Sequence, residues 1–141
     1  MRLRFLPTAA FLVVSICGGM LAAQSKRPIT ETDLFQFTWI GDPQVSPDGS
    51  RVVFVRVSVN AKKDGYDSGL FVAGTTAEEP PRRLTTGPHD SSPQWSPDGS
   101  SLAFVRAIEQ DGKRLPPQLF LLSMRGGEPL QLTDLPRGAA G

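Results

Sequence analysis

The chain has 141 residues, with 15 lysines and arginines against 14 aspartates and glutamates, and a single cysteine. This length allows one ordinary domain at most. A content of 39% hydrophobic and 21% charged residues is a globular balance that argues against wholesale disorder. A net charge near +1 without a basic run argues against a protein that binds nucleic acid electrostatically. The 14 glycines and 13 prolines favour many short strands and turns over long helices.

Residues 1–23 have the pattern of a secretory signal peptide. Arg2 and Arg4 form a positive segment, a short apolar core follows, and small residues precede a predicted cleavage before Gln24. The apolar stretch is short for a membrane-spanning helix, which needs about 20 residues. An uncleaved N-terminal anchor and a lipoprotein acylated at Cys17 remain as alternatives, the latter opposed by the bulky residue before that cysteine. We therefore expect an exported protein, periplasmic or secreted, without membrane association after cleavage.

The mature chain that this cleavage would produce contains no cysteine. Export permits disulfides without requiring them, so the stability of this chain must come from a packed core. Redox, thiolate and cysteine-based zinc chemistry are excluded for the mature chain. We expect neither a cofactor nor a metal.

Residues 24–41 form a lead-in that contains a short helix, predicted over Thr30 to Phe37. Thr30 can cap this helix, and Asp33 stands three residues later, as in a capping box with aspartate in place of the usual glutamate. Leu34 and the two phenylalanines that follow it give the helix an apolar side. We expect this side to pack on the next structural unit or on a partner domain.

The strongest signal in the sequence is an internal repeat. The segment PQVSPDGSRVVFVR at residues 43–56 recurs as PQWSPDGSSLAFVR at residues 93–106, with ten of fourteen positions identical. Shorter matches follow each copy at nearly the same spacing: LFV at 70–72 with LFL at 119–121, and RLT at 83–85 with QLT at 131–133. A period near 50 residues that contains several short strands is typical of β-propeller blades.

Each repeat unit contains the turn sequence Ser-Pro-Asp-Gly. Proline presets φ near −65°, aspartate tolerates the next position, and glycine adopts the left-handed conformation, which suits a tight hairpin with a bulge. The strand that follows is nearly continuous in apolar residues, as in a sheet covered on both faces. The predicted strands are 51–57 and its repeat, 70–73, 119–122, 81–85 and 130–133, with polar loops at 60–68 and 109–117.

The predicted fold is therefore all-β, with two four-stranded antiparallel blades of an incomplete β-propeller and a short leading helix. The predicted division of the chain is a signal peptide at 1–23, the lead-in at 24–41, a first blade at 42–88, a second blade at 89–136 and the start of a truncated third blade at 137–141.

These motifs resemble a known family. WSPDGSSLAFVR at 95–106 resembles the bacterial propeller repeat, of TolB/WD40-like type, that TolB-like proteins share with the S9 (prolyl oligopeptidase) serine peptidases. ITETDLFQFTWIGDPQVSPDGSRVVFVR at 29–56 is similar to the propeller start of acylaminoacyl-peptidase and dipeptidyl-peptidase-like S9 enzymes. GGEPLQLTDLPRGAAG at 126–141 resembles the end of one such blade and the beginning of the next. The resemblance covers residues 29–141.

The resemblance implies a two-domain hydrolase, in which an N-terminal propeller covers a C-terminal α/β-hydrolase domain that acts on peptides. In that family the catalytic serine stands in a G-x-S-x-G motif, followed by aspartate and histidine. The 141 residues contain no G-x-S-x-G, so no catalytic residue can be assigned. We expect the chain to be inactive alone, as a fragment or a truncated product whose partners are the hydrolase domain and peptide substrates.

Structural roles are favoured for the residues that could suggest catalysis. Ser46 and Ser96 each precede proline in a turn, without a histidine nearby in the sequence. Asp48 and Asp98 hold equivalent places in the two units, so turn structure explains both. His89, the single histidine, is the one base available for a Ser-His-Asp site, and we expect it to be a solvated loop residue beside an aspartate.

Structural roles are also favoured for the remaining candidates. Asp64 to Asp67 resembles a calcium loop only faintly, because the ligand spacing and the closing glutamate are missing. One histidine with scattered carboxylates supports a metal site poorly. Trp95 and Phe104 are predicted core residues, whereas Trp39 fits either core or interface. The pairs Lys62–Lys63 and Arg82–Arg83 are predicted to be solvated strand ends.

Three hypotheses for function remain at this point. The first is the N-terminal propeller portion of an exported S9 serine peptidase, which admits short peptides to a buried site. The second is a non-catalytic, TolB-like periplasmic propeller that binds protein partners. The third is a stand-alone two-blade adaptor, which would leave apolar faces exposed and invite self-assembly. The helix-led start of the first unit favours the first hypothesis.

Overall fold

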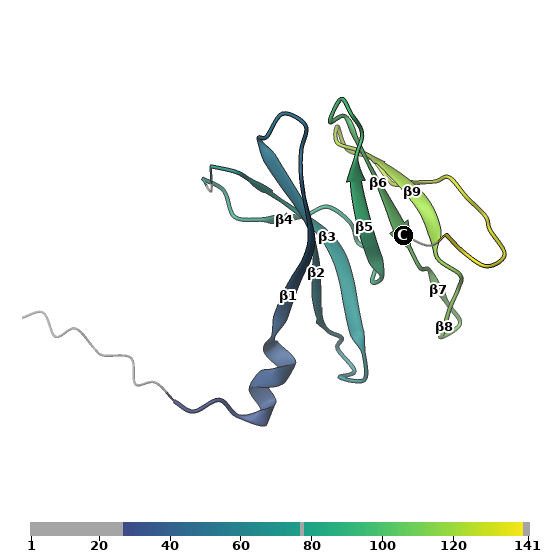
Figure 1. Cartoon of the computed structure of the whole chain (residues 1–141). Coiled ribbons are helices and arrows are strands. Elements are labelled where there is room, and N and C mark those ends of the chain that lie inside the picture. The colour runs from purple at the N-terminus through teal and green to yellow at the C-terminus, as the bar shows by residue number, and fades with distance from the viewer. Residues whose placement is uncertain (1–26, 77, 140–141) are drawn as a thin grey trace, which may run out of the picture.

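The two repeat units form two four-stranded antiparallel sheets in the computed structural model, which describes residues 27–76 and 78–139 (Figure 1). Blade 1 contains, in spatial order, β1 (Thr38–Val45), β2 (Arg51–Val59), β3 (Tyr66–Gly74) and β4 (Arg82–Arg83). Blade 2 contains, in the same order, β5 (Asp90–Trp95), β6 (Ser101–Arg106), β9 (Gln118–Ser123) and β10 (Leu130–Gln131). The predicted all-β fold of two blades from an incomplete propeller is confirmed. The predicted signal peptide lies outside the described residues.

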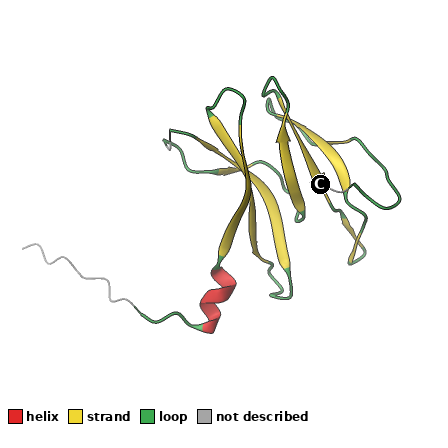
Figure 2. Ribbon diagram, in the orientation of Figure 1, coloured by secondary structure: helices red, strands yellow, loops and turns green. Residues whose placement is uncertain are grey.

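A short helix leads into the first blade, as the sequence predicted. The 3₁₀ helix η1 (Glu31–Gln36) ends just before β1 and lies beyond the end of the sheet at which β1 begins (Figure 2). Strand β1 starts at Thr38, inside the segment predicted as lead-in, so the blade begins earlier than residue 42.

The segment 109–117, predicted as a polar loop, contains a two-stranded hairpin of β7 (Glu109–Gln110) and β8 (Lys113–Arg114). The physical reason is the two-residue turn between the strands. Asp111 has φ 52° and Gly112 has φ 72°. A turn with both central residues at positive φ matches the twist of a hairpin, and Asp-Gly is a preferred sequence for it.

The first strand of each blade, β1 or β5, carries a β-bulge that was not predicted from the sequence. The register against the next strand shifts between Gly41 and Gln44 in β1, and between Ser91 and Gln94 in β5. The repeat prolines lie in the bulges, where a residue that cannot donate a ladder hydrogen bond is tolerated. The residues before these prolines, Asp42 and Ser92, adopt φ values of 47° and 51°.

The two Ser-Pro-Asp-Gly turns are held by the same hydrogen bonds. Ser46 Oγ accepts a bond from the Arg51 amide at 2.9 Å, and the Asp48 carboxylate accepts bonds from Ser46 Oγ and from the amide and hydroxyl of Ser50. The second turn repeats every one of these contacts fifty residues later. Gly49 has φ 71° and Gly99 has φ 67°, as the turn sequence predicted.

The turn aspartates are expected to make the chain sensitive to acid. Hydrogen bonds from the serines lower the pKa of Asp48 and of Asp98 from 3.8 to about 2. Because the folded-state pKa is the lower one, this stabilisation is complete above the unfolded pKa and is lost as pH falls from about 4 to about 2. Urea unfolding midpoints should fall over that range, and less steeply in the double variant Asp48→Asn/Asp98→Asn than in the control Glu79→Gln. Equal slopes in the two variants would contradict the assignment.

A single core lies between the two blades. Blade 1 contributes the β2 and β3 side chains that face blade 2, and blade 2 contributes the β6 and β9 side chains that face blade 1. The buried cluster consists of Val53, Val55, Leu70, Leu102, Phe104, Phe120 and Leu122. Each such side chain contributes about 1.5–3 kcal/mol on burial. Trp95 lies at the rim of this cluster. Its Nε1 donates to the Gln44 carbonyl at 3.0 Å, and this bond joins β5 to β1.

Candidate functional site

The Ser-Pro-Asp-Gly turns and the lead-in helix lie at opposite ends of the blades. Strand β1 begins and β2 ends at the lead-in end, where the β2–β3 loop, the linker between blades and the β7–β8 hairpin also lie (Figure 1). The serines and aspartates of the turns are occupied with the hydrogen bonds that shape those turns, and His89 lies in the linker. The structure therefore does not bring the predicted serine and histidine candidates together, and the polar side chains of interest gather at the lead-in end.

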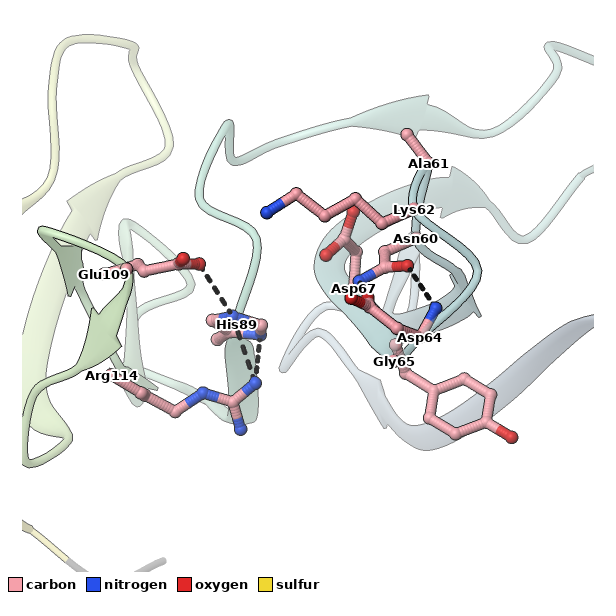
Figure 3. A pocket seen from close by; sticks show the side chains of 11 residues that line it. Asn60, Ala61, Lys62, Asp64, Gly65, Asp67, His89, Glu109 and Arg114 are labelled. Carbon is pink, nitrogen blue, oxygen red and sulfur yellow. Dashed lines mark hydrogen bonds and ion pairs between the residues drawn. The ribbon is translucent and has the colours of Figure 1, made fainter.

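An open cavity of about 490 Å³ lies at this end, between the β2–β3 loop of blade 1 and the β7–β8 hairpin of blade 2 (Figure 3). Charged side chains of both signs line it. Lys62 and Arg114 are the basic residues, and Asp64, Asp67 and Glu109 are the acidic ones. A lining of this kind suits a polar partner with charges of both signs rather than a simple anion or cation.

His89 lies between the two blades in this cavity. Its side chain is only 13% exposed, so the prediction of a solvated histidine is wrong. The reason is the path of the linker, which forms a bridge to β3 at Ser68 and accepts a backbone hydrogen bond from Ala107 at 3.1 Å. The linker thereby places the ring between the β7–β8 hairpin and blade 1.

Two side chains of the β7–β8 hairpin contact the His89 ring. Arg114 Nη2 lies 3.1 Å from both ring nitrogens, and Glu109 Oε2 lies 3.8 Å from Nε2 (Figure 3). In the part of the chain that the structure describes, no hydroxyl is hydrogen-bonded to this ring. The ring therefore contacts one basic and one acidic side chain of the hairpin.

The cavity wall on the blade 1 side is a hydrogen-bonded turn. The Asn60 side chain donates to Asp64 Oδ1 at 2.8 Å, and its carbonyl oxygen accepts from the Asp64 amide at 3.2 Å. The Asn60 backbone also closes the turn by bonding to Gly65 and Lys63. These hydrogen bonds give Asp64 a structural role in the turn, in the segment that faintly resembles a calcium loop. Among residues 27–76 and 78–139, no group of three or more histidine, cysteine, aspartate or glutamate side chains is placed to hold a metal ion.

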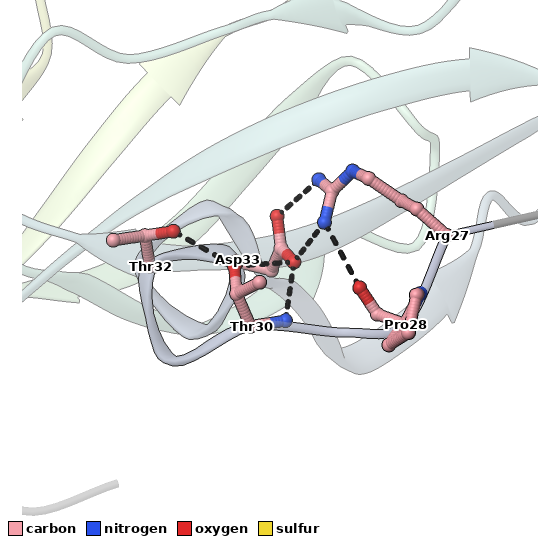
Figure 4. A network of polar contacts seen from close by, with 5 residues as sticks. All are labelled: Arg27, Pro28, Thr30, Thr32 and Asp33. Carbon is pink, nitrogen blue, oxygen red and sulfur yellow. Dashed lines mark hydrogen bonds and ion pairs between the residues drawn. The ribbon is translucent and has the colours of Figure 1, made fainter.

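The lead-in is fixed by a polar network of its own. The Thr30 amide donates to Asp33 Oδ2 at 2.7 Å, which confirms the predicted capping box, and Arg27 makes a two-bond ion pair with the same carboxylate (Figure 4). These contacts hold the pKa of Asp33 well below its usual range, chiefly through Arg27. The network orders the chain where it enters blade 1.

An exposed apolar patch adjoins the network. Phe35 lies beneath Lys63 Nζ at 5.0 Å, and Trp39 packs edge-on against Tyr66 with ring centroids 5.5 Å apart. Trp39 is nevertheless 46% exposed, so it belongs to the surface rather than to the core. The members of this patch are Leu34, Phe35, Phe37, Trp39 and Tyr66, and each is at least 44% exposed. The helix thus packs only partly on blade 1 and leaves apolar surface uncovered.

Asp90 has a structural role that was not predicted from the sequence. It is fully buried and makes a two-bond ion pair with Arg106, at 2.7 and 3.0 Å. Arg106 in turn lies over the rings of Phe104 and Phe120. The sequence did contain a signal, which is a difference between the two repeats. Arg106 has an arginine, Arg56, at the equivalent position of the first unit, whereas the position equivalent to Asp90 is Ile40.

The chain is similar in sequence to a protein that is named as a peptidase. It is 36% identical over 120 residues to an uncharacterized peptidase, YuxL of Bacillus subtilis, a match that covers 82% of this chain and 17% of that protein. The chain thus spans about a sixth of the length of this relative. No family model matches the chain. The described residues contain no helix that is long and apolar enough to span a membrane.

Solved structures agree with the fold. The chain is similar to Pyrococcus horikoshii acylaminoacyl peptidase, with a TM-score of 0.56 and 18% identity over 71% of this chain and 15% of that chain. It is also similar to the β-propeller domain of the Trilobed protease from Pyrococcus furiosus, with a TM-score of 0.55 and 18% identity over 71% of this chain and 29% of that chain. The predicted resemblance to the N-terminal propeller of S9-type peptidases is confirmed.

Proposed function

We propose that this chain is the N-terminal propeller portion of an exported S9-type serine peptidase, and that it controls the access of peptides to a C-terminal α/β-hydrolase domain. The observation that carries the proposal is the match of 36% identity to a peptidase over 120 residues. The two blades, the lead-in helix and the similar fold of peptidase propellers support it. Catalysis in this proposal belongs to residues of the hydrolase domain.

The lead-in end of the blades is the proposed contact with that domain. The apolar patch and the mixed charges around His89 lie next to each other there, which is the usual composition of an interface with an apolar centre and a polar rim. The chain also enters blade 1 at this end. A propeller that covers the hydrolase domain would admit only substrates small enough to pass it, so we propose short peptides as the substrates.

The first test is the reading frame beyond codon 141. We expect further Ser-Pro-Asp-Gly repeats and then G-x-S-x-G with later aspartate and histidine. A frame that continues through blades and stops without a hydrolase domain would overturn the proposal.

The second test is the activity of the chain itself. The 141-residue chain, expressed for export, should give no hydrolysis of acyl-aminoacyl or peptide chromogenic substrates above a heat-denatured control. The full reading-frame product should cleave short peptides and leave a folded protein uncut. The recovered protein should begin at Gln24 by mass spectrometry. Hydrolysis by the 141-residue chain would contradict the absence of a catalytic site, and an unprocessed N-terminus would contradict signal cleavage.

A further inference from the structure

Four turns of the chain contain the sequence Asp-Gly, at residues 48–49, 64–65, 98–99 and 111–112. In this sequence the glycine amide nitrogen can attack the aspartate side-chain carboxyl carbon, because glycine has no side chain to shield that nitrogen. A C–N bond forms and closes a succinimide ring, while the amide hydrogen and the carboxyl hydroxyl leave together as water. Water then opens the ring. Opening at the main-chain carbonyl carbon breaks its bond to the nitrogen and leaves isoaspartate, whose main chain runs through the side-chain carbons and is longer by one carbon atom.

The two Ser-Pro-Asp-Gly turns hold both reacting groups in place. The Asp48 carboxylate accepts hydrogen bonds from two serines, and the Gly49 amide donates to the Ser46 carbonyl at 2.8 Å. Asp98 and Gly99 repeat these contacts in the second turn. Each turn also joins two strands that pair within a four-stranded sheet. Ring closure there requires that several hydrogen bonds break first, so these two aspartates are protected.

The Asp64 carboxylate is held as well, by the side chain of Asn60. The Nδ2 atom of Asn60 donates to Asp64 Oδ1 at 2.8 Å, and a Cβ on Gly65 would lie 3.4 Å from the same nitrogen. The side-chain amide of Asn60 therefore lies against this Asp-Gly pair and fixes its carboxylate. We expect ring closure at Asp64 to be slower than at an aspartate whose carboxylate is free.

Asp111 differs from the other three aspartates because neither of its reacting groups is held. Within residues 27–76 and 78–139, the Asp111 carboxylate accepts no hydrogen bond and the Gly112 amide donates none. The β7–β8 hairpin around them has two residue pairs and forms a two-stranded sheet of its own. Such a ribbon is marginally stable by itself, so it can open while the blades stay folded. Opening gives the Asp111 main chain, which has φ 52° in the closed turn, the freedom to bring its carboxyl carbon to the glycine nitrogen.

We propose that Asp111 is a site of spontaneous isoaspartate formation, and that this modification releases the β7–β8 hairpin from His89. The turn between the two strands has only two residues, so an added main-chain carbon shifts the pairing of Glu109 with Arg114. These two side chains contact the His89 ring, at 3.8 and 3.1 Å. The modification therefore alters the hairpin wall of the cavity. The proposal rests on contacts within the hairpin and its neighbours and does not depend on the proposed peptidase function.

Ageing of the purified chain at neutral pH tests the first part of the proposal. The untagged chain, recovered after export, is sampled over several weeks and digested, and isoaspartate in each peptide is measured with protein isoaspartyl methyltransferase. Asp111 should convert at least about tenfold faster than Asp48 or Asp98, because the hydrogen bonds of those two must break first. In urea all four Asp-Gly pairs should convert at similar rates, since no turn holds them. The proposal is overturned if Asp111 stays unmodified in the folded chain while the chain in urea converts, or if another pair of the folded chain converts as fast.

Two variants of Asp111 and a matched control test the chemistry. Asp111→Glu keeps the charge but would have to close a larger ring, so it should abolish isoaspartate at this position. Asp134→Glu makes the same change at another exposed aspartate and should leave the conversion of Asp111 at the wild-type rate. Asp111→Asn keeps a sequence that the hairpin turn prefers and reaches the same ring with ammonia as the leaving group. It should produce isoaspartate at least as fast as the wild type, and a variant that forms none would contradict the succinimide route.

The single histidine of the chain reports on the second part of the proposal. Its ring protons should give one set of NMR signals in fresh protein, and a second set should grow at the rate at which isoaspartate appears. Circular dichroism spectra should stay unchanged, because the two blades do not depend on the hairpin. After the same ageing, Asp111→Glu should keep the original set alone. Isoaspartate at residue 111 without a new histidine signal would show that the hairpin stays on His89 and would overturn its release.

Discussion

Replacing Asp90 with alanine is expected to lower the free energy of unfolding by about 3–5 kcal/mol, because Arg106 would keep its buried place and lose its carboxylate. Asp90 is fully buried and the Arg106 side chain is only 14% exposed, so water replaces the lost carboxylate poorly. The guanidinium cannot move away easily, since it lies over two phenylalanine rings and against the linker, where a Cβ on Gly87 would lie 2.6 Å from Arg106 Nε. Urea unfolding followed by circular dichroism measures this loss.

The matched change in blade 1 is Ile40→Asp, which recreates the same pair on the side of blade 1 that points away from blade 2. Arg56 is exposed there and lies over Phe71. An exposed ion pair is worth about 0–1 kcal/mol, so this variant should be nearly neutral or slightly more stable. Equal, small effects of Asp90→Ala and Ile40→Asp would contradict the view that burial between the blades makes the Asp90 pair important. A double variant that also replaces Arg106 with leucine should recover much of the stability.

The repeat in the sequence was sufficient to predict the blades, because it determines several features at once. The turn residues of Ser-Pro-Asp-Gly require particular φ values, and the apolar strand after them requires cover on both faces. The first requirement is local and is met in both turns. The second is met on the side of each strand that lies between the two blades. The β7–β8 hairpin was also local, since Asp111 and Gly112 are a hairpin turn sequence. That signal was present and was read as a loop.

The candidate site depended on contacts that a sequence alone does not give. His89 is largely covered because two segments distant in the chain, β3 and the β7–β8 hairpin, meet around it. Asp90 and Arg106 are sixteen residues apart and become partners only through the register of β5 and β6. The difference from the first unit, where Ile40 faces Arg56, could have indicated that the second unit contains a pair of its own.

Replacing Phe104 with alanine is expected to cost about 3–5 kcal/mol, and the same change at Phe54 is expected to cost about 1–2 kcal/mol less. The two residues are the same type at the same repeat position, and both stack on a phenylalanine of the next strand. Phe104 is fully buried between the blades, so its loss leaves a cavity with walls from both sheets. Phe54 is 8% exposed and lies on the side of blade 1 that points away from blade 2, so its loss leaves a depression with walls from one sheet only.

Urea unfolding of the two variants, followed by circular dichroism, measures both costs. The difference between the two free energies of unfolding measures the effect of the blade that covers Phe104. Equal costs would contradict the view that the neighbouring blade makes the Phe104 site harder to relax, and would mean that the Phe54 site is as rigid as the core.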